Sequence, residues 1–295
     1  MGQELVHRAG DKPPPLWSTQ VMMDMPGLVA EVHADYAKSG ARVATTNTYA
    51  IHRDRLRGGS NHYAADGLVM DDLEDQFFDL LDAALNEADK VRDRCTIAGS
   101  VGPLGASYRA DLHPDVETAT ALYAEVARHI APRVDVLLFE TLPSITAVQA
   151  ALAAGRQTDK PVWLALTVND SDGSLLRSGE AVRDAADYAA GADAILINCS
   201  VPEVVADALD ALSQTGTPLG AYANGFTKIE DDFINGGTTV ASLSARKDLS
   251  PETYAAHALK WVDHGATILG GCCEVGPAHI QEMARHLKSA GHVLV

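Results

Sequence analysis

The sequence predicts an α/β fold, a (β/α)8 barrel of the TIM type, formed by a single domain that spans residues 1–295. Two observations carry this prediction. Short apolar runs alternate with segments of helical periodicity along most of the chain, which is the pattern of βαβ units and a parallel sheet. Polar residues and cysteines follow directly after the apolar runs, and barrel enzymes place their chemistry at such strand ends.

The apolar runs give seven expected strands, at residues 43–48, 96–101, 134–139, 162–168, 194–197, 219–222 and 267–269. Helical spacing of apolar residues predicts helices at residues 26–38, 68–91, 117–129, 145–154, 179–190, 203–213, 252–264 and 278–288. Residues 227–249, rich in Asp, Gly, Ser and Thr, are expected to form a long loop.

The first expected helix has no strand before it, and a closed barrel needs eight strands. We therefore expect the first strand to be missing or to lie upstream of Met1. A doubly wound open sheet is the alternative fold, since it tolerates seven strands. Against it, no Gly-x-Gly-x-x-Gly turn follows an early strand.

Composition restricts the class of protein. The chain is 46% hydrophobic, has a formal net charge of −17 and contains four cysteines. Such a charge argues against nucleic acid as a partner. The sequence shows neither a signal peptide nor a membrane-spanning apolar run. We expect a cytoplasmic protein that acts on small molecules without membrane contact, and the sequence leaves open whether it is a homo-oligomer.

Three of the four cysteines follow two expected strands. Cys199 comes after residues 194–197, and the pair Cys272-Cys273 comes after residues 267–269. Thiolates are the preferred ligands of zinc, and a catalytic zinc keeps one of its four positions open. The alternative is that these cysteines are small buried hydrophobic residues, as we expect for Cys95. His279 could be drawn as a fourth ligand, but we expect it on the surface of the last helix.

The chain carries a set of short motifs in a fixed order. They are Leu16-Trp17, Thr46-Asn47-Thr48-Tyr49, Gly99-Ser100-Val101-Gly102-Pro103, Glu140-Thr141, Thr167, Leu176-Arg177-Ser178-Gly179-Glu180, Asn198-Cys199, Tyr222-Ala223-Asn224 and Gly270-Gly271-Cys272-Cys273. In this order they resemble the homocysteine S-methyltransferase family, from Met1 to about Leu287. One such motif is weak evidence, whereas the set in register is strong.

The resemblance implies roles for individual residues. Cys199, Cys272 and Cys273 match the zinc ligands of the family, and Glu140 matches the carboxylate that holds the amino group of homocysteine. Aromatic positions near the methyl donor match Trp17 and Tyr49, while Thr46, Asn47 and Asn198 match residues that shape the site. No catalytic residue beyond the metal site is implied. Glu140 in a structural ion pair, and Trp17 and Tyr49 as core aromatics, stay open as alternatives.

The implied reaction is a zinc-dependent methyl transfer from a sulfonium donor to the thiolate of homocysteine, which gives methionine and serves methionine biosynthesis. The expected donor is S-methylmethionine or S-adenosylmethionine. Zinc is needed because a free thiol, with a pKa near 8.5, is mostly protonated at neutral pH. Alternatives are a member that uses betaine or a seleno-acceptor, a zinc-binding barrel impaired in catalysis with a binding or regulatory role, and a metal-free lyase of the same fold class.

The family also carries a first strand that ends in Asp-Gly-Gly, whose aspartate helps to bind the amino group of homocysteine. The sequence begins after the position of this motif. We therefore expect Met1 to be an internal methionine of a longer chain, and activity without that strand is an open question.

Overall fold

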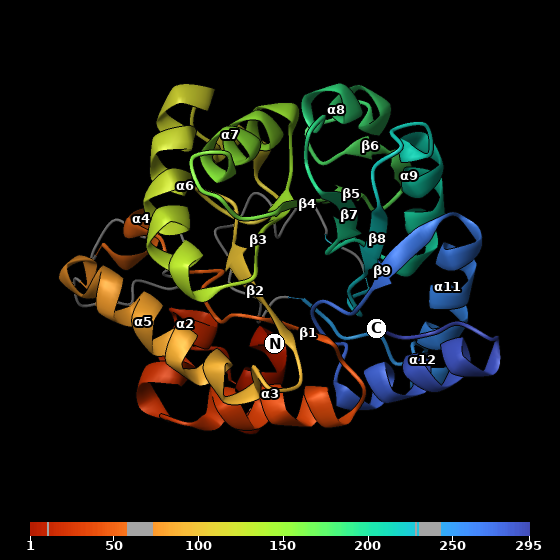
Figure 1. Ribbon diagram of the computed structural model, residues 1–295, viewed down its shortest axis with the longest axis horizontal. Coiled ribbons are helices and arrows are strands. Elements are labelled where there is room, and N and C mark those ends of the chain that lie inside the picture. Colours follow the sequence, from red (N-terminus) through yellow and green to blue (C-terminus); the bar gives the residue numbers. More distant parts are fainter. Residues whose placement is uncertain (11, 58–72, 228, 230–242) are drawn as a thin grey trace.

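The computed structural model describes residues 1–10, 12–57, 73–227, 229 and 243–295. Seven strands form one curled parallel sheet in the order β1-β2-β3-β4-β7-β8-β9, and helices surround it (Figure 1). The strands are β1 Val43–Thr45, β2 Thr96–Val101, β3 Val136–Leu142, β4 Val162–Leu166, β7 Ala194–Asn198, β8 Leu219–Tyr222 and β9 Ala266–Leu269. The predicted α/β class and parallel sheet are thus confirmed.

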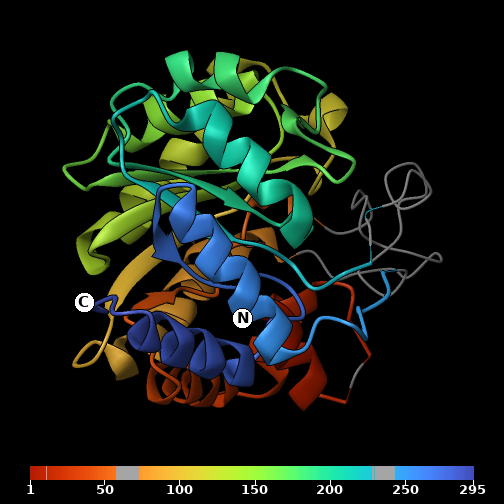
Figure 2. The same cartoon turned by 90° about the vertical axis from the view of Figure 1, so that its right-hand side faces the viewer.

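The edges of the sheet are β1 and β9. Each pairs on one side only, β1 with β2 and β9 with β8, so the described residues do not close the barrel between them. The eighth strand of the predicted barrel is not among these residues. Figure 2 shows the sheet and its helices from the side.

Most helices lie where the apolar periodicity predicts them. They are α3 Leu28–Lys38, α5 Phe77–Ala88, α6 Val116–Ile130, α7 Ile145–Gly155, α8 Val182–Tyr188, α9 Val205–Leu212, α11 Pro251–Asp263 and α12 Pro277–Ser289. Side chains of Asp115, Ser144 and Ser250 cap the first turns of α6, α7 and α11 by accepting backbone N–H groups. The expected start of the second helix, at residues 68–72, and most of the long loop at 227–249 lie outside the described residues.

The two faces of the sheet have different surroundings. On β2, Ile97 points outward and packs with the helices in the main apolar core, whereas Ala98 points inward and packs with Leu138 of β3. Side chains alternate along a strand, so Ser100 and Glu140 lie on the same inner face, further along. The curl of the sheet therefore directs these polar groups into the interior at the carboxyl ends of the strands.

Several elements were not predicted. They are the helices α1 Gly2–Arg8, α2 Trp17–Asp24 and α4 Arg53–Leu56, and a hairpin of β5 Val168–Asn169 with β6 Asp172–Leu176. The sequence indicated one strand at 162–168, but β4 ends at Leu166 and the chain turns back at Asp170 and Ser171. On β6, a side chain at Gly173 would meet the carbonyl oxygen of Val204 at 2.0 Å, so this close approach requires glycine.

Single turns of 3-10 helix occupy Glu74–Gln76, Asp89–Val91, Ala110–Leu112, Ala131–Arg133 and Pro202–Val204. Within the described ranges, no helix has the length and apolar character needed to cross a membrane.

Candidate metal and substrate site

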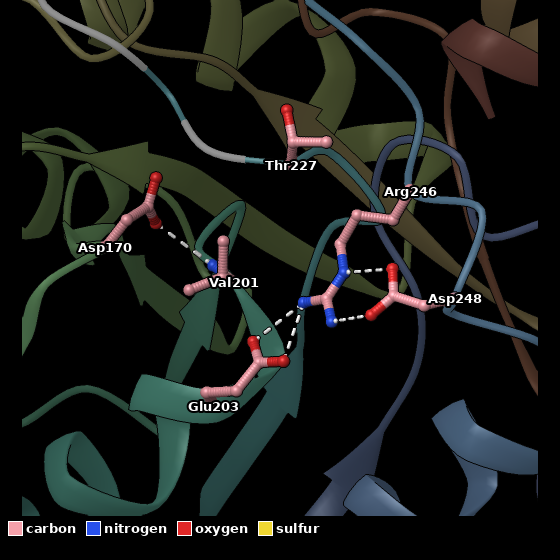
Figure 3. Close-up of a pocket in the computed structure, with 6 residues that line it drawn as sticks. All are labelled: Asp170, Val201, Glu203, Thr227, Arg246 and Asp248. Carbon is pink, nitrogen blue, oxygen red and sulfur yellow. Dashed lines mark hydrogen bonds and ion pairs between the residues drawn. The ribbon is translucent and has the colours of Figure 1, made fainter.

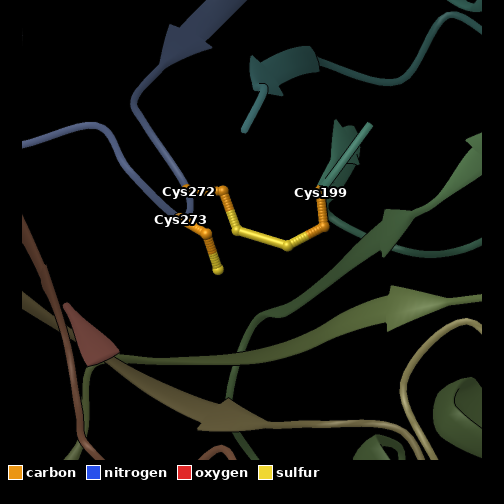
Figure 4. A group of neighbouring side chains, drawn as sticks. All are labelled: Cys199, Cys272 and Cys273. Carbon is orange, nitrogen blue, oxygen red and sulfur yellow. A yellow bond between two sulfur atoms is a disulfide. The ribbon is translucent and has the colours of Figure 1, made fainter. Parts of the chain in front are cut away.

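The three predicted cysteines meet at the carboxyl ends of β7 and β9. Their Sγ atoms all lie within 4.8 Å of one another, and a disulfide joins Cys199 to Cys272 while Cys273 is a free thiol (Figure 4). In a tetrahedral zinc site with Zn–S bonds of about 2.3 Å, the sulfur atoms lie about 3.8 Å apart. The three cysteines therefore supply the donor set of a zinc site and, once the disulfide is reduced, lie near enough to one another to adopt this spacing.

Backbone hydrogen bonds fix both cysteine segments to the end of β8. Cys199 donates its N–H to the carbonyl oxygen of Tyr222 at 3.4 Å, and Cys272 donates to that of Ala223 at 3.0 Å. The carbonyl of Cys273 accepts the N–H of Gly225 at 2.8 Å. The strand between the two cysteine segments is thus the scaffold that brings them together.

Strained backbone gathers around the same place. Among the described residues, the non-glycine residues in the left-handed region are Trp17, Tyr108, Thr141, Cys199 and Glu274, with φ between 47° and 69°. Two of them are predicted site residues, and Thr141 and Glu274 directly follow Glu140 and Cys273. Such conformations are costly and persist where the surroundings impose them, which is typical of functional sites.

Glu140 lies on β3 with its carboxylate buried in the interior. It accepts hydrogen bonds from the hydroxyl of Ser100 and, at 3.0 Å, from that of Tyr222. Burial raises the pKa of Glu140, while these two hydrogen bonds and the nearby amino group of Met1 oppose the rise. None of the ion pairs in the described part of the chain joins a Lys, Arg or His side chain to Glu140, so its structural ion-pair alternative finds no partner there. A buried carboxylate held by neutral donors suits a cationic ligand.

The predicted aromatic pair is also together. Trp17 and Tyr49 contact edge to face with ring centroids 6.0 Å apart, and both are half-buried. The indole N–H of Trp17 donates to Gln3 at 2.8 Å, and the hydroxyl of Tyr49 is 2.8 Å from that of Ser107. Polar contacts thus fix one end of each ring.

The other three predicted residues are buried and bonded to the protein. Thr46 accepts the N–H of Ser100 at 3.0 Å, and Asn47 donates to the carbonyl oxygen of Ser18 at 3.1 Å. Asn198 forms two hydrogen bonds of 3.0 Å with Thr141, one to its N–H and one to its hydroxyl. These hydrogen bonds hold Ser100 itself, Ser18 next to Trp17, and Thr141 next to Glu140. Such contacts fit a role in shaping the site.

Three further polar residues belong to the site and received no role from the sequence. Ser100 and Tyr222 hold Glu140, and Asn224 has a buried Nδ2 without a hydrogen-bond partner in the described part of the chain. All three lie at the carboxyl ends of strands, which is the signal that could have found them. Ser100 lies within β2, as the predicted strand at residues 96–101 placed it, but the motif at residues 99–103 assigned no role to its side chain.

His279 forms hydrogen bonds with backbone groups and does not join the cysteine cluster among the described residues. Its Nδ1 accepts the N–H of Gly276 at 3.2 Å, and its Nε2 lies 3.1 Å from the carbonyl oxygen of Leu249. It lies on α12, the last helix, as predicted, and its side chain is partly buried. Cys95 is buried in the apolar core, as predicted.

The chain is similar to known proteins over nearly its whole length. Residues 1–287 match the family described as homocysteine S-methyltransferase. It is 31% identical to a homocysteine S-methyltransferase of Escherichia coli (strain K12), over 95% of this chain and 91% of the relative. It is 25% identical to a selenocysteine methyltransferase of Astragalus bisulcatus, over 98% and 91%.

The fold has a solved counterpart of similar extent. The metallated form of the homocysteine methyltransferase MmuM from Escherichia coli superposes with a TM-score of 0.74 at 27% identity, covering 97% of this chain and 94% of that one. The barrel-type architecture predicted from the sequence is confirmed by this likeness.

Proposed function

This chain belongs to the homocysteine S-methyltransferase family, and we propose that it moves a methyl group from a sulfonium donor to the sulfur of homocysteine. It is a methyltransferase by that membership. The observation that carries the proposal further is the meeting of three cysteine sulfurs within 4.8 Å, at the strand ends of a sheet whose inner face also carries a buried carboxylate.

Zinc is the proposed cofactor, held by Cys199, Cys272 and Cys273 after reduction of the disulfide between the first two. The donor set supports this choice, since three thiolates suit a thiophilic ion and leave a fourth position for a substrate. When bound, the ion would supply the positive charge that keeps cysteine and homocysteine thiols deprotonated at neutral pH.

The protein without a cation opposes ionisation of its own thiols. Burial raises the pKa of Cys273 to about 12, so this thiol stays protonated at neutral pH in the metal-free chain. A bound cation would favour the thiolate form that the metal-free site disfavours.

Glu140 is the proposed partner of the substrate ammonium group. Homocysteine carries its sulfur and its ammonium on one short chain, so a thiolate-rich centre and a carboxylate facing the same interior suit its two ends. Ser100 and Tyr222 hold the carboxylate in place, so that it need not reorganise when the substrate binds. A charge-assisted hydrogen bond to Glu140 would orient the sulfur.

Trp17 and Tyr49 are the proposed wall of the donor pocket. Aromatic rings attract cations over their faces, and a methylsulfonium is such a cation. In the reaction, the homocysteine thiolate attacks the methyl carbon in line, the bond from that carbon to the donor sulfur breaks, and a neutral thioether leaves. No proton transfer is required in this step. The residues therefore act by binding and alignment.

Methyl transfer assays with the reduced, zinc-supplied protein test the proposal. S-methylmethionine, S-adenosylmethionine and betaine are each offered with homocysteine, and methionine is quantified. We expect methionine from a sulfonium donor and none from a Cys273→Ser variant. Zinc binding without transfer to homocysteine or to selenohomocysteine would contradict the proposal and favour a binding role. Preference for the seleno-acceptor would place the chain with relatives named for selenocysteine.

A further inference from the structure

A buried ion pair lies directly behind the metal-binding cysteines. Arg177 and Asp170 pair at 2.8 Å, and their side chains are 5% and 1% exposed. Asp170 lies in the turn between β5 and β6, and Arg177 follows β6. Arg177 belongs to one of the sequence motifs but was assigned no role there, and the reaction proposed above uses neither Arg177 nor Asp170.

Asp170 joins three segments of the chain. Its Oδ1 accepts the N–H of Val201 at 3.0 Å as well as the guanidinium of Arg177, and its Oδ2 accepts the N–H of Ile229 at 2.9 Å. Figure 3 shows Asp170 and Val201 at the edge of a cavity of about 460 Å³, in which Arg246 pairs separately with Glu203 and Asp248. The Asp170 carboxylate thus connects the hairpin of β5 and β6 to the backbone of two other segments, at Val201 and at Ile229.

Arg177 reaches the carbonyl of Cys199. Its Nη2 lies 3.4 Å from that oxygen, and its Nε lies 3.4 Å from the hydroxyl of Thr167, which itself donates to the same carbonyl at 3.3 Å. The guanidinium also lies over the ring of Tyr108, 5.2 Å from its centroid. Tyr108 packs in one apolar cluster with Cys199, so the guanidinium and the ring support the same segment.

These contacts enclose a strained residue. Cys199 has φ +47°, a conformation that a non-glycine residue adopts only when its neighbours impose it. Its carbonyl is bonded through Arg177 and Thr167, and the N–H of Val201, two residues later, is bonded to Asp170. The direction of the Cys199 side chain follows from this backbone conformation, and a metal ligand needs a fixed direction.

We propose that Arg177 and Asp170 form a positioning pair for the metal centre, which holds Cys199 in its left-handed conformation and thereby sets the affinity of the three-thiolate site for a thiophilic divalent cation. This inference rests on the proposed metal site. A buried ion pair is weak evidence for a role in stability alone, because desolvation offsets much of its attraction. The pair is neutral as a whole, so its effect on the site is geometric.

The test compares metal affinity with stability in two variants. Arg177→Lys keeps the charge and the pairing with Asp170 but has one ammonium group, which cannot bond Asp170, Thr167 and Cys199 together. Arg177→Met combined with Asp170→Asn removes both charges and leaves no buried ion unpaired. Arg133→Met, which breaks a partly exposed Arg–Asp pair between two 3-10 turns remote from the cysteines, is the control.

Zn²⁺ affinity is measured on the reduced proteins by competition with a chromophoric chelator, beside urea unfolding of the metal-free forms. We expect both site variants to bind zinc about tenfold to a hundredfold more weakly, the usual effect of removing the partners that orient a ligand. Cobalt-substituted variants should show weaker sulfur-to-cobalt charge-transfer absorption, because Cys199 is misdirected. The Arg133→Met control should change stability only slightly, because a partly exposed ion pair contributes little, and should keep the parent's zinc affinity and cobalt spectrum.

Zinc affinity within about twofold of the parent in both site variants would overturn this inference and leave the proposed function standing. A reduced parent that binds no zinc would overturn both. Weaker binding in the Arg133→Met control, matching that of the site variants, would also count against the pair, since it would trace the loss to general stability.

Discussion

Two opposing effects act on the ionisation of Glu140. Its carboxylate is buried, which raises its pKa and favours the neutral form, yet the ligand proposed for it is a cation. The hydroxyl groups of Ser100 and Tyr222 favour the charged form by donating to both oxygens. The two hydroxyl groups hold the carboxylate in place, and the proposed ammonium partner would favour its charged form further.

Replacing Glu140 by Gln should weaken homocysteine binding specifically. The change removes the charge but keeps the size, and a hydrogen bond to a charged group contributes about 1.5–3 kcal/mol, or roughly 10-fold to 150-fold in kcat/KM. Steady-state kinetics should show the loss mainly as a higher KM for homocysteine, with the KM of the donor and the zinc content unchanged. Glu125→Gln, at a partly exposed position on α6, is the control. An unchanged KM for homocysteine would refute the role of Glu140.

The same variant should be more stable than the parent at neutral pH. Because the pKa of Glu140 is raised on folding, its contribution to stability is full below the unfolded value of about 4.5 and is lost as pH rises through the folded value. Urea unfolding of the metal-free proteins should therefore show Glu140→Gln above the parent at pH 7, with the gap closing toward pH 4. A less stable variant at pH 7 would mean that the carboxylate has a stabilising partner.

The limits of sequence reasoning at this scale are visible around Glu140. The sequence alone predicted Glu140 at a strand end and within a motif, and it predicted the three cysteines of the cluster. The hydrogen bond from the hydroxyl of Tyr222 to Glu140 could not be predicted, because β8 lies three strands away from β3 in the sheet and only the curl of the sheet brings the two together. Contacts across the interior depend on the closure of the whole sheet.

The ends of neighbouring strands are tied by side chains as well as by backbone. Asn198, the last residue of β7, bonds twice to Thr141 near the end of β3, although β4 lies between the two strands. Thr141 has φ +61°, so this link holds a strained residue directly after Glu140. Asn198 therefore helps to fix the backbone at the end of β3 as well as belonging to β7.

Asn198→Ala should destabilise the protein by about 1–3 kcal/mol, because it leaves the N–H of Thr141 buried and unpaired. If Asn198 shapes the site without touching substrate, kcat/KM for homocysteine and for the donor should fall together. Asn169→Ala, which removes a local turn contact on β5, is the comparison. A selective rise in the KM of one substrate would instead make Asn198 a direct binding residue.

Element positions were predictable where periodicity was long. All seven strands of the parallel sheet and the amphipathic helices around them follow from apolar spacing, with ends shifted by a few residues. Strand β3, for example, runs on through Glu140 to Leu142, whereas the sequence predicted its end at residue 139. The hairpin of β5 and β6 was missed because its first residues continue the apolar run of β4. Helix α2 was missed because its start depends on the left-handed Trp17 and on Asn47, which donates to Ser18 from a distant loop.

At the scale of the whole molecule, two buried imidazoles among the described residues couple stability to pH. His33 and His52 are each 2% exposed, and burial lowers the pKa of each from 6.5 to about 4. The unfolded chain binds these protons more readily, so stability is lost as pH falls from about 6.5 toward 4, by about 1.4 kcal/mol per pH unit for each group.

Urea unfolding between pH 7.5 and 4 should show this slope, and His52→Gln should reduce it. His292→Gln, at an exposed position, should leave it unchanged. A slope that His52→Gln does not alter would show that other groups govern acid unfolding.

Metal content tests the central claim, that three cysteines gathered by the curled sheet form a cofactor site. Zinc per chain is measured on the reduced protein, on Cys199→Ser and on Cys95→Ser, whose thiol lies in the apolar core. We predict about one zinc per chain in the parent and in Cys95→Ser, and a sharp loss in Cys199→Ser. A folded, reduced parent without zinc, or a Cys199→Ser variant that keeps it, would contradict the account.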